Sequence, residues 1–184
     1  MSQILVLAAC AGLVVWGVLI FNRLVRDRNQ VRSAWSDIDV QLTRRHDLVP
    51  RLVDAVRAYA EYERATLSAV TELRARAAAA GPLRDKARLE DEMEAVLHRL
   101  IALAEAYPEL KADGNFLQLQ HDLVETEDHL QYARRFYNGS VRIYNTRIES
   151  FPDMLVAKPF AFAPAEFFAV DDAEVRAAPR VEPA

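Results

Sequence analysis

The sequence is poor in cysteine, glycine and histidine, and each scarcity excludes a kind of site. The single cysteine, Cys10, excludes a disulfide within one chain and a metal cluster held by several thiolates of that chain. The five glycines are too dispersed to form a glycine-rich phosphate-binding loop. None of the four histidines follows a glutamate by three positions, so the Glu-x-x-His pairs of di-iron helical bundles are missing. A net charge of −4 argues against a nucleic-acid-binding protein.

Two Glu–His pairs with a four-residue spacing remain as candidate metal ligands. Glu94–His98 and Glu125–His129 would each lie on one face of a helix. Such pairs arise often by chance on helix surfaces, where residues four apart are neighbours. We therefore expect no metal, no cofactor and no catalytic residue, and we expect that the protein is not an enzyme.

Ile4–Phe21 is a run of eighteen residues without a charged side chain. As a helix it would be about 27 Å long, close to the thickness of the hydrocarbon core of a bilayer. A cleaved signal peptide is the alternative, but no Lys or Arg precedes the run and no small-residue cleavage site follows it. The sequence favours a single-pass transmembrane anchor over residues 1–22.

The charges that flank this run predict its orientation. Arg23, Arg26 and Arg28 follow it closely, and no basic residue precedes it. The positive-inside rule then places the N-terminus outside and the remainder of the chain in the cytoplasm.

The middle of the chain, residues 23–152, has few helix-breaking residues and predicts an antiparallel bundle of three long helices. Alternating steps of four and three residues from Val31 to Ala77 give one long apolar stripe, which indicates a helix packed on other helices. Its members are Val31, Trp35, Ile38, Leu42, Arg45, Val49, Leu52, Val56, Tyr59, Glu63, Thr66, Val70, Leu73 and Ala77.

Pro50 interrupts this stripe without changing its phase. A proline inside a helix costs about 3 kcal/mol or more, because a hydrogen bond is lost and the ring clashes with the preceding turn. Burial of each large apolar side chain of the stripe contributes about 1.5–3 kcal/mol, so we favour a continuous helix kinked at Pro50, giving four helical segments in all. A tight reversal at His46–Val49, with two antiparallel helices, is the alternative.

Two further helices follow. Gly81 and Pro82 should end the first helix, and Leu89, Met93, Val96, Leu100 and Leu103 form the stripe of the second. Asn115 and Gln118 resemble a capping box that opens the third. The third stripe consists of Phe116, Leu119, Leu123, Leu130, Tyr137, Val141, Tyr144, Ile148 and Phe151.

The last part of the chain changes character. Five of the eight prolines follow Phe151 and exclude a long helix. Residues 153–170 contain Phe160, Phe162, Phe167 and Phe168, which are too apolar for a solvated tail. We expect this segment to lie extended on the bundle or on a partner, and residues 171–184 to form a disordered acidic tail.

Charged side chains near the middle of the first helix are the only candidates for a binding layer. Arg45 falls at a core position, where an unpaired charge is costly. We expect Arg44, His46 and Asp47 to contribute to the same layer, with carboxylates from Glu125 and Glu127. Arg134 and Arg135 are the expected partners of Asp37 or Asp39. A paired layer that fixes helix register is the favoured interpretation, and a ligand-binding layer around Asp39, Arg45 and Arg135 is the alternative.

Four segments in order resemble the LemA family of bacterial proteins: Ala34–Glu63 (AWSDIDVQLTRRHDLVPRLVDAVRAYAEYE), Tyr107–Asp128, Ala133–Pro152 and Pro164–Phe168. The resemblance implies a single-pass inner-membrane protein of a bacterium with a helical-bundle domain and no established catalytic activity. The family includes members at magnetosome membranes and members whose genes lie near membrane proteases. It supplies no catalytic or binding residues. Residues after Asp171 depart from its pattern.

Three functional hypotheses follow. The favoured one is a non-enzymatic, membrane-anchored scaffold or adaptor for other membrane proteins, with a membrane protease as one candidate partner. A ligand- or lipid-sensing module with a pocket at the charged layer is the second. A hydrolase or metalloenzyme is the third and has least support, because no catalytic motif is recognisable.

Overall fold

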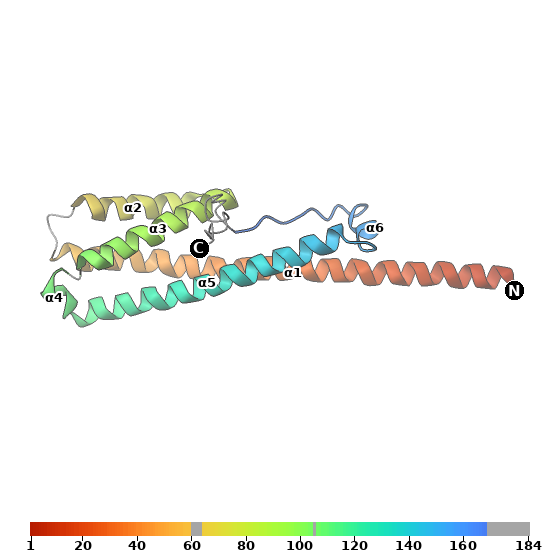
Figure 1. The fold of residues 1–184 in the computed structure, drawn as a ribbon, viewed down its shortest axis with the longest axis horizontal. Coiled ribbons are helices and arrows are strands. Elements are labelled where there is room, and N and C mark those ends of the chain that lie inside the picture. Colours follow the sequence, from red (N-terminus) through yellow and green to blue (C-terminus); the bar gives the residue numbers. More distant parts are fainter. Residues whose placement is uncertain (60–63, 105, 169–184) are drawn as a thin grey trace, which may run out of the picture.

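The computed structural model describes residues 1–59, 64–104 and 106–168, and it is all-α over this part of the chain (Figure 1). Four long helices are α1 (Ser2–Arg57), α2 (Arg64–Ala79), α3 (Leu83–Ala104) and α5 (Gly114–Glu149). Single helical turns form α4 (Pro108–Lys111) and α6 (Met154–Ala157). The predicted fold class, an all-α chain with a long apolar N-terminal helix, is confirmed.

The molecule is an elongated rod built on α1 and α5 (Figure 1). α2 and α3 form a hairpin that covers this pair near the C-terminal end of α1. Towards the other end, α5 stops and the N-terminal part of α1 continues alone. We call the part of the rod beside α2 and α3 its distal half, and the part between that hairpin and the lone stretch of α1 its proximal half.

Pro50 lies inside α1, which continues to Arg57. The alternative of a reversal at His46–Val49 is therefore wrong. The proline has no N–H to donate to the carbonyl of His46, four residues earlier. Nε of Arg74, on α2, donates to this carbonyl oxygen at 2.7 Å. The neighbouring helix thus replaces the hydrogen bond that Pro50 cannot make.

A single helix from Val31 to Ala77 is a wrong prediction. α1 ends at Arg57, and α2 begins at Arg64 and runs back along α1 (Figure 1). The apolar pattern continues across this reversal because α1 and α2 each direct an apolar stripe into the same core. Tyr59 is 38% exposed and Thr66 is half-buried, so the stripe fails near the connection. Glu63 lies outside the described residues.

The other helix boundaries agree with the sequence in outline and differ at two ends. α2 ends at Ala79, shortly before Gly81 and Pro82, and α3 follows at once. The cap of α5 is Asp113 and not Asn115: its carboxylate accepts hydrogen bonds from the N–H groups of Asn115 and Phe116 at 2.8 and 2.9 Å. Phe151 was expected in the buried stripe, but it follows the end of α5 and is 78% exposed.

The distal half has a core that is almost wholly aliphatic. It draws on α1, α2, α3, α4 and α5, and its buried residues are Leu48, Val49, Leu52, Val53, Val56, Leu67, Val70, Leu73, Ala77, Leu89, Met93, Leu97, Leu100, Ala104, Leu110, Phe116 and Leu123. The proximal half has a core with more aromatic side chains. Its buried residues are Ile20, Leu24, Val31, Ala34, Ile38, Leu42, Ala87, Leu130, Ala133, Tyr137, Val141, Tyr144, Ile148, Ala157, Phe162 and Phe168.

Residues 162–168, which we call the tail strand, are extended and run back along the proximal half (Figure 1). Two asparagines of α5 hold its backbone. Asn145 donates to the carbonyl of Ala165 and accepts from its N–H, each at 2.9 Å. Asn138 does the same for Phe168, at 3.0 and 2.9 Å. An extended strand has no internal hydrogen bonds, so these side chains satisfy groups that would otherwise be buried without partners.

Two tyrosines of α5 complete this set of contacts. The hydroxyl of Tyr137 donates to the carbonyl of Glu166 at 2.8 Å, and that of Tyr144 to the carbonyl of Ala163 at 3.0 Å. Phe162 and Phe168 are buried, whereas Phe160 and Phe167 are exposed. The expectations for residues 169–170 and for the acidic tail 171–184 lie outside the described residues.

Candidate functional site

One helix of the described residues, α1, is long and apolar enough to cross a membrane. Only 6% of its most apolar window is buried within the protein. A core helix of a soluble protein would be mostly buried, so the exposure of this window suits contact with lipid. Protein packing on α1 begins with Ile20 and Leu24, which are 6% and 0% exposed.

A buried charged layer crosses the distal half and is centred on Arg45 of α1, which is 1% exposed. Nη2 of Arg45 lies 2.5 Å from Oε2 of Glu127 on α5. Its Nη1 donates to the backbone carbonyl of Glu90 on α3 at 3.0 Å and lies 3.4 Å from Oε2 of the same residue. One guanidinium thus joins three helices, and the expected pairing of Arg45 with Glu127 is present.

His46 extends the layer by one residue along α1. Its Nε2 lies 2.8 Å from Oε1 of Glu90, whose side chain is completely buried. Both carboxylate oxygens of Glu90 therefore have partners. A buried ion pair adds little stability over apolar side chains, but the loss of one partner leaves an uncompensated charge. The layer lies where the faces of α1, α3 and α5 meet.

Other charges of the predicted layer pair differently from the expectation. Arg44 lies 2.6 Å from Glu125, as expected for the third helix. Arg134 lies 2.8 Å from Asp91 of α3, and not on Asp37 or Asp39. The predicted partnership failed because α3, and not the first helix, faces Arg134.

Two further expectations about this region also need correction. Asp39 lies 3.3 Å from Lys86 at the start of α3. Arg135 and Asp47 are on the exposed surface. The alternative of a pocket lined by Asp39, Arg45 and Arg135 is therefore wrong: of these three residues, only Arg45 lines the pocket beside the layer.

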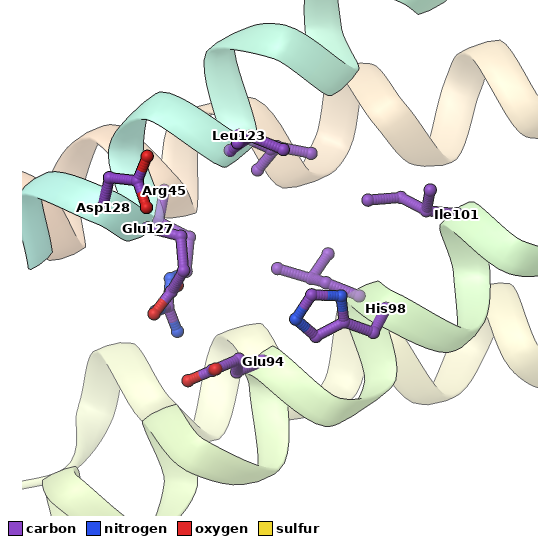
Figure 2. A pocket seen from close by; sticks show the side chains of 9 residues that line it. Arg45, Glu94, His98, Ile101, Leu123, Glu127 and Asp128 are labelled. Atoms are coloured by element: carbon purple, nitrogen blue, oxygen red, sulfur yellow. The ribbon is translucent and has the colours of Figure 1, made fainter. Parts of the chain in front are cut away.

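That pocket lies between α3 and α5, has a volume of about 200 Å³ and is open on one side. Figure 2 shows its polar and apolar walls. Glu94, His98 and Ile101 of α3 face Leu123, Glu127 and Asp128 of α5, and Arg45, Leu97 and Val124 complete the lining. The space would admit a small ligand with one apolar side and one cationic or hydrogen-bonding end.

Glu94, on the α3 side of this pocket, has a raised pKa. Partial burial raises the pKa of its carboxyl above the usual 4.5, and the negative charge of Glu127 raises it further. Arg45 and Arg134 oppose this rise. Glu94 thus takes up a proton more readily than a solvated glutamate does.

The candidate metal pairs are not joined by further ligands. Nε2 of His129 lies 3.9 Å from Glu125 on the exposed face of α5, and Glu94 and His98 both line the pocket. Within residues 1–59, 64–104 and 106–168, no three His, Cys, Asp or Glu side chains are grouped closely enough to hold a metal ion.

Glu90 is the important residue that sequence reasoning missed. It stands beside Leu89 and was outside the apolar stripe of the second helix. Leu97 and Ala104, seven and fourteen positions later, are both buried, so a heptad row of α3 predicts that Glu90 points inward. A glutamate at a core position of α3 and an arginine at a core position of α1 could together have predicted this buried ion pair.

The sequence of this chain matches known proteins of one family. The sequence model of the LemA family matches residues 34–182, the segment that follows the apolar stretch of α1. Protein LemA of Metamycoplasma hominis is 29% identical over 140 residues, which cover 74% of this chain and 63% of that protein. Magnetosome proteins MamQ 1 and MamQ 2 of Paramagnetospirillum magneticum are each 33% identical over 72 residues, 39% of this chain and 26% of theirs.

The chain therefore spans less than two thirds of the length of these relatives. The family match nevertheless includes α2, α3 and α5, the charged layer and the tail strand. Because the match extends over most of the sequence, the chain belongs to the LemA family.

Proposed function

We propose that this protein is a non-enzymatic scaffold or adaptor, held at a membrane by α1, which binds other membrane proteins along its helical rod. The observation that carries the proposal is the internal pairing of the charged layer. Arg45, Glu90 and Glu127 bind one another inside the bundle. Their arrangement fixes the shape of a rigid rod, and a rod of fixed shape presents its outer surface in a fixed position.

The outer surface offers a place for such a partner. Val40 of α1 and Tyr132 and Phe136 of α5 line a shallow hollow, and they are 62%, 65% and 41% exposed. Large apolar side chains that cluster on a surface commonly mark protein contacts. Asp37 and His129 also line the hollow and would provide polar contacts.

The proposed setting is the inner membrane of a bacterium, with the N-terminus outside and the rod in the cytoplasm. Arg23, Arg26 and Arg28 support this orientation through the positive-inside rule. The proposed partner is a membrane protein with a cytoplasmic part, and the family resemblance makes a membrane protease the first candidate. No contact with nucleic acid is proposed.

Site-specific photo-crosslinking in native membranes tests the scaffold. A benzophenone amino acid at Tyr132 or Phe136 should give an adduct with a second membrane protein, which mass spectrometry identifies. Leu117, 49% exposed on the distal part of α5, is the matched control and should give no adduct. Equal labelling from all three positions, or none from any, would contradict a specific scaffold surface.

A sensing role is the second candidate, because the pocket between α3 and α5 has both an apolar and an acidic wall. The chemistry of these walls suits a small amphiphile with a cationic head. Hexylammonium is a suitable probe, and its binding should shift the NMR signals of the His98 ring while those of His121, exposed elsewhere on α5, stay unchanged. Unchanged His98 signals at saturating probe would remove this candidate.

A further inference from the structure

The turn that joins α5 to the tail strand lies beside the apolar stretch of α1. We call residues 151–160, which include α6, the α6 loop. The ring of Phe160 lies 5.0 Å from that of Phe21, centroid to centroid, in an edge-to-face arrangement. Phe21 is the last residue of the uncharged stretch Ile4–Phe21.

Other residues of the α6 loop also lie against the apolar stretch of α1. Val156 and Phe160 share a shallow hollow with Val14, Gly17, Val18 and Phe21. Pro152 and Asp153 line a second hollow, with Trp16, Leu19 and Ile20 on its α1 side and Arg23 and Arg26 beyond them. The α6 loop therefore lies level with residues 14–26 of α1.

The rise per residue of a helix shows how far the α6 loop extends along the apolar stretch of α1. Val14 precedes Phe21 by seven residues, which corresponds to about 10 Å at 1.5 Å per residue. If the uncharged stretch of α1 spans the hydrocarbon, the loop beside it occupies the boundary between acyl chains and headgroups. Apolar side chains of interfacial elements enter a bilayer by about 5–10 Å.

The side chains that the loop exposes suit this position. Phe151, Leu155 and Phe160 are 78%, 56% and 61% exposed, although each is large and apolar. The loop carries only two charges. Asp153 is partly buried and lies 3.9 Å from Arg147, and the exposed Lys158 is long enough to reach the headgroups.

We propose that the α6 loop is a second membrane contact: Phe151, Leu155 and Phe160 insert into the lipid interface beside α1. Arg23 and Arg26 of α1 flank the same level and would bind anionic headgroups. The rod is then fixed to the bilayer at two places, α1 and the α6 loop, and it cannot tilt freely about α1. The proposal depends on the anchoring of α1 and not on the scaffold function.

Spin labels on the full chain in vesicles of phosphatidylethanolamine and phosphatidylglycerol test this proposal. The native Cys10, exposed within the apolar stretch, reports on the anchor itself. In a Cys10→Ala background, Leu155→Cys reports on the loop and Val124→Cys reports on an exposed apolar position of the distal half. Leu155 and Val124 are 56% and 55% exposed, so a label at either site leaves the core unchanged.

Collisions with oxygen, which concentrates in lipid, are compared with collisions with a water-soluble nickel complex. The proposal predicts that the oxygen-to-nickel ratio at position 155 is several-fold higher than at position 124 and approaches the ratio at Cys10. A high ratio at Cys10 with equal, low ratios at 155 and 124 would overturn the lipid contact and leave the anchor intact. A low ratio at Cys10 would overturn the anchor and the loop contact together.

Discussion

The two halves of the rod bury apolar surface with different kinds of side chain. In the distal half, helix packs on helix. Among the described residues, Phe116 is the one aromatic member of the buried core there. In the proximal half, the tail strand replaces a helix, and Tyr137, Tyr144, Phe162 and Phe168 enter the core. A helix satisfies its own backbone, so aliphatic side chains suffice against it, whereas an extended strand requires polar side chains from its neighbour.

The two halves also place their polar groups differently. The distal half concentrates charge in one layer, at Arg45, Glu90 and Glu127. The proximal half spreads neutral hydrogen bonds along the strand, at Asn138, Tyr137, Tyr144 and Asn145. One lost contact should therefore affect the whole distal half but only a part of the strand.

The largest effect is expected for Arg45→Ala in the distal half. The substitution leaves Glu90 buried without its cation, which should lower the free energy of unfolding by about 3–5 kcal/mol. Chemical denaturation of the full chain in detergent measures the loss. The triple variant Arg45→Met, Glu90→Leu and Glu127→Leu should recover most of it, because the buried cation and both of its carboxylate partners are then removed together. Failure of this recovery would show that the layer contributes more than pairing.

A smaller and more local effect is expected for Asn145→Ala in the proximal half. The N–H and carbonyl of Ala165 lose both hydrogen bonds, which should cost about 1–3 kcal/mol. Hydrogen exchange at Ala165 and Phe168 should accelerate, while exchange in α2 and α3 should not change. Asn145→Asp is the matched comparison: it keeps an acceptor for the N–H of Ala165, but it replaces the donor by a negatively charged oxygen beside the carbonyl of Ala165. Accelerated exchange in α2 or α3 would contradict the independence of the two halves.

A still smaller effect is expected at Pro50 and Arg74. Arg74→Met removes the donor to the carbonyl of His46 and should cost about 1–1.5 kcal/mol. Pro50→Ala restores an N–H to the helix, so the same Arg74→Met change should cost much less in that background. Equal costs in both backgrounds, measured as a double-mutant cycle by thermal unfolding, would show that Arg74 does not replace the missing bond.

The smallest effect is a pH dependence at Glu94. Burial raises the pKa of this carboxyl in the folded protein, so its ionisation opposes folding above that pKa, and the opposition is absent below the unfolded pKa near 4.5. Glu94→Gln should therefore increase stability at neutral pH and have no stabilising effect at about pH 4. Denaturation curves of both proteins at the two pH values measure this difference. A constant difference across this range would contradict the cause given for the shift.

The sequence predicted the helices better than their connections. Buried positions from Val31 to Val56 follow the predicted stripe, because a long regular period is a strong signal. The reversal after Arg57 was missed because the apolar phase continued into α2, although the polar residues Glu63 and Thr66 interrupt it in the sequence. The partner of Arg45 on α5 was predicted, and the one on α3 was not, since pairing between helices depends on how each rotates about its axis. The hydrogen bonds from Asn138 and Asn145 to the tail strand follow no sequence pattern that could have predicted them.

The path of the tail strand determines where its last residue, Phe168, lies along α1. The ring of Phe168 lies 5.8 Å from that of Trp35, fourteen residues along α1 from Phe21. At 1.5 Å per residue, this contact lies about 21 Å along the rod from the end of the uncharged stretch. Phe168 is therefore held at a set distance from the apolar stretch of α1, and a protein that bound the chain there would be kept at that distance from a membrane spanned by α1.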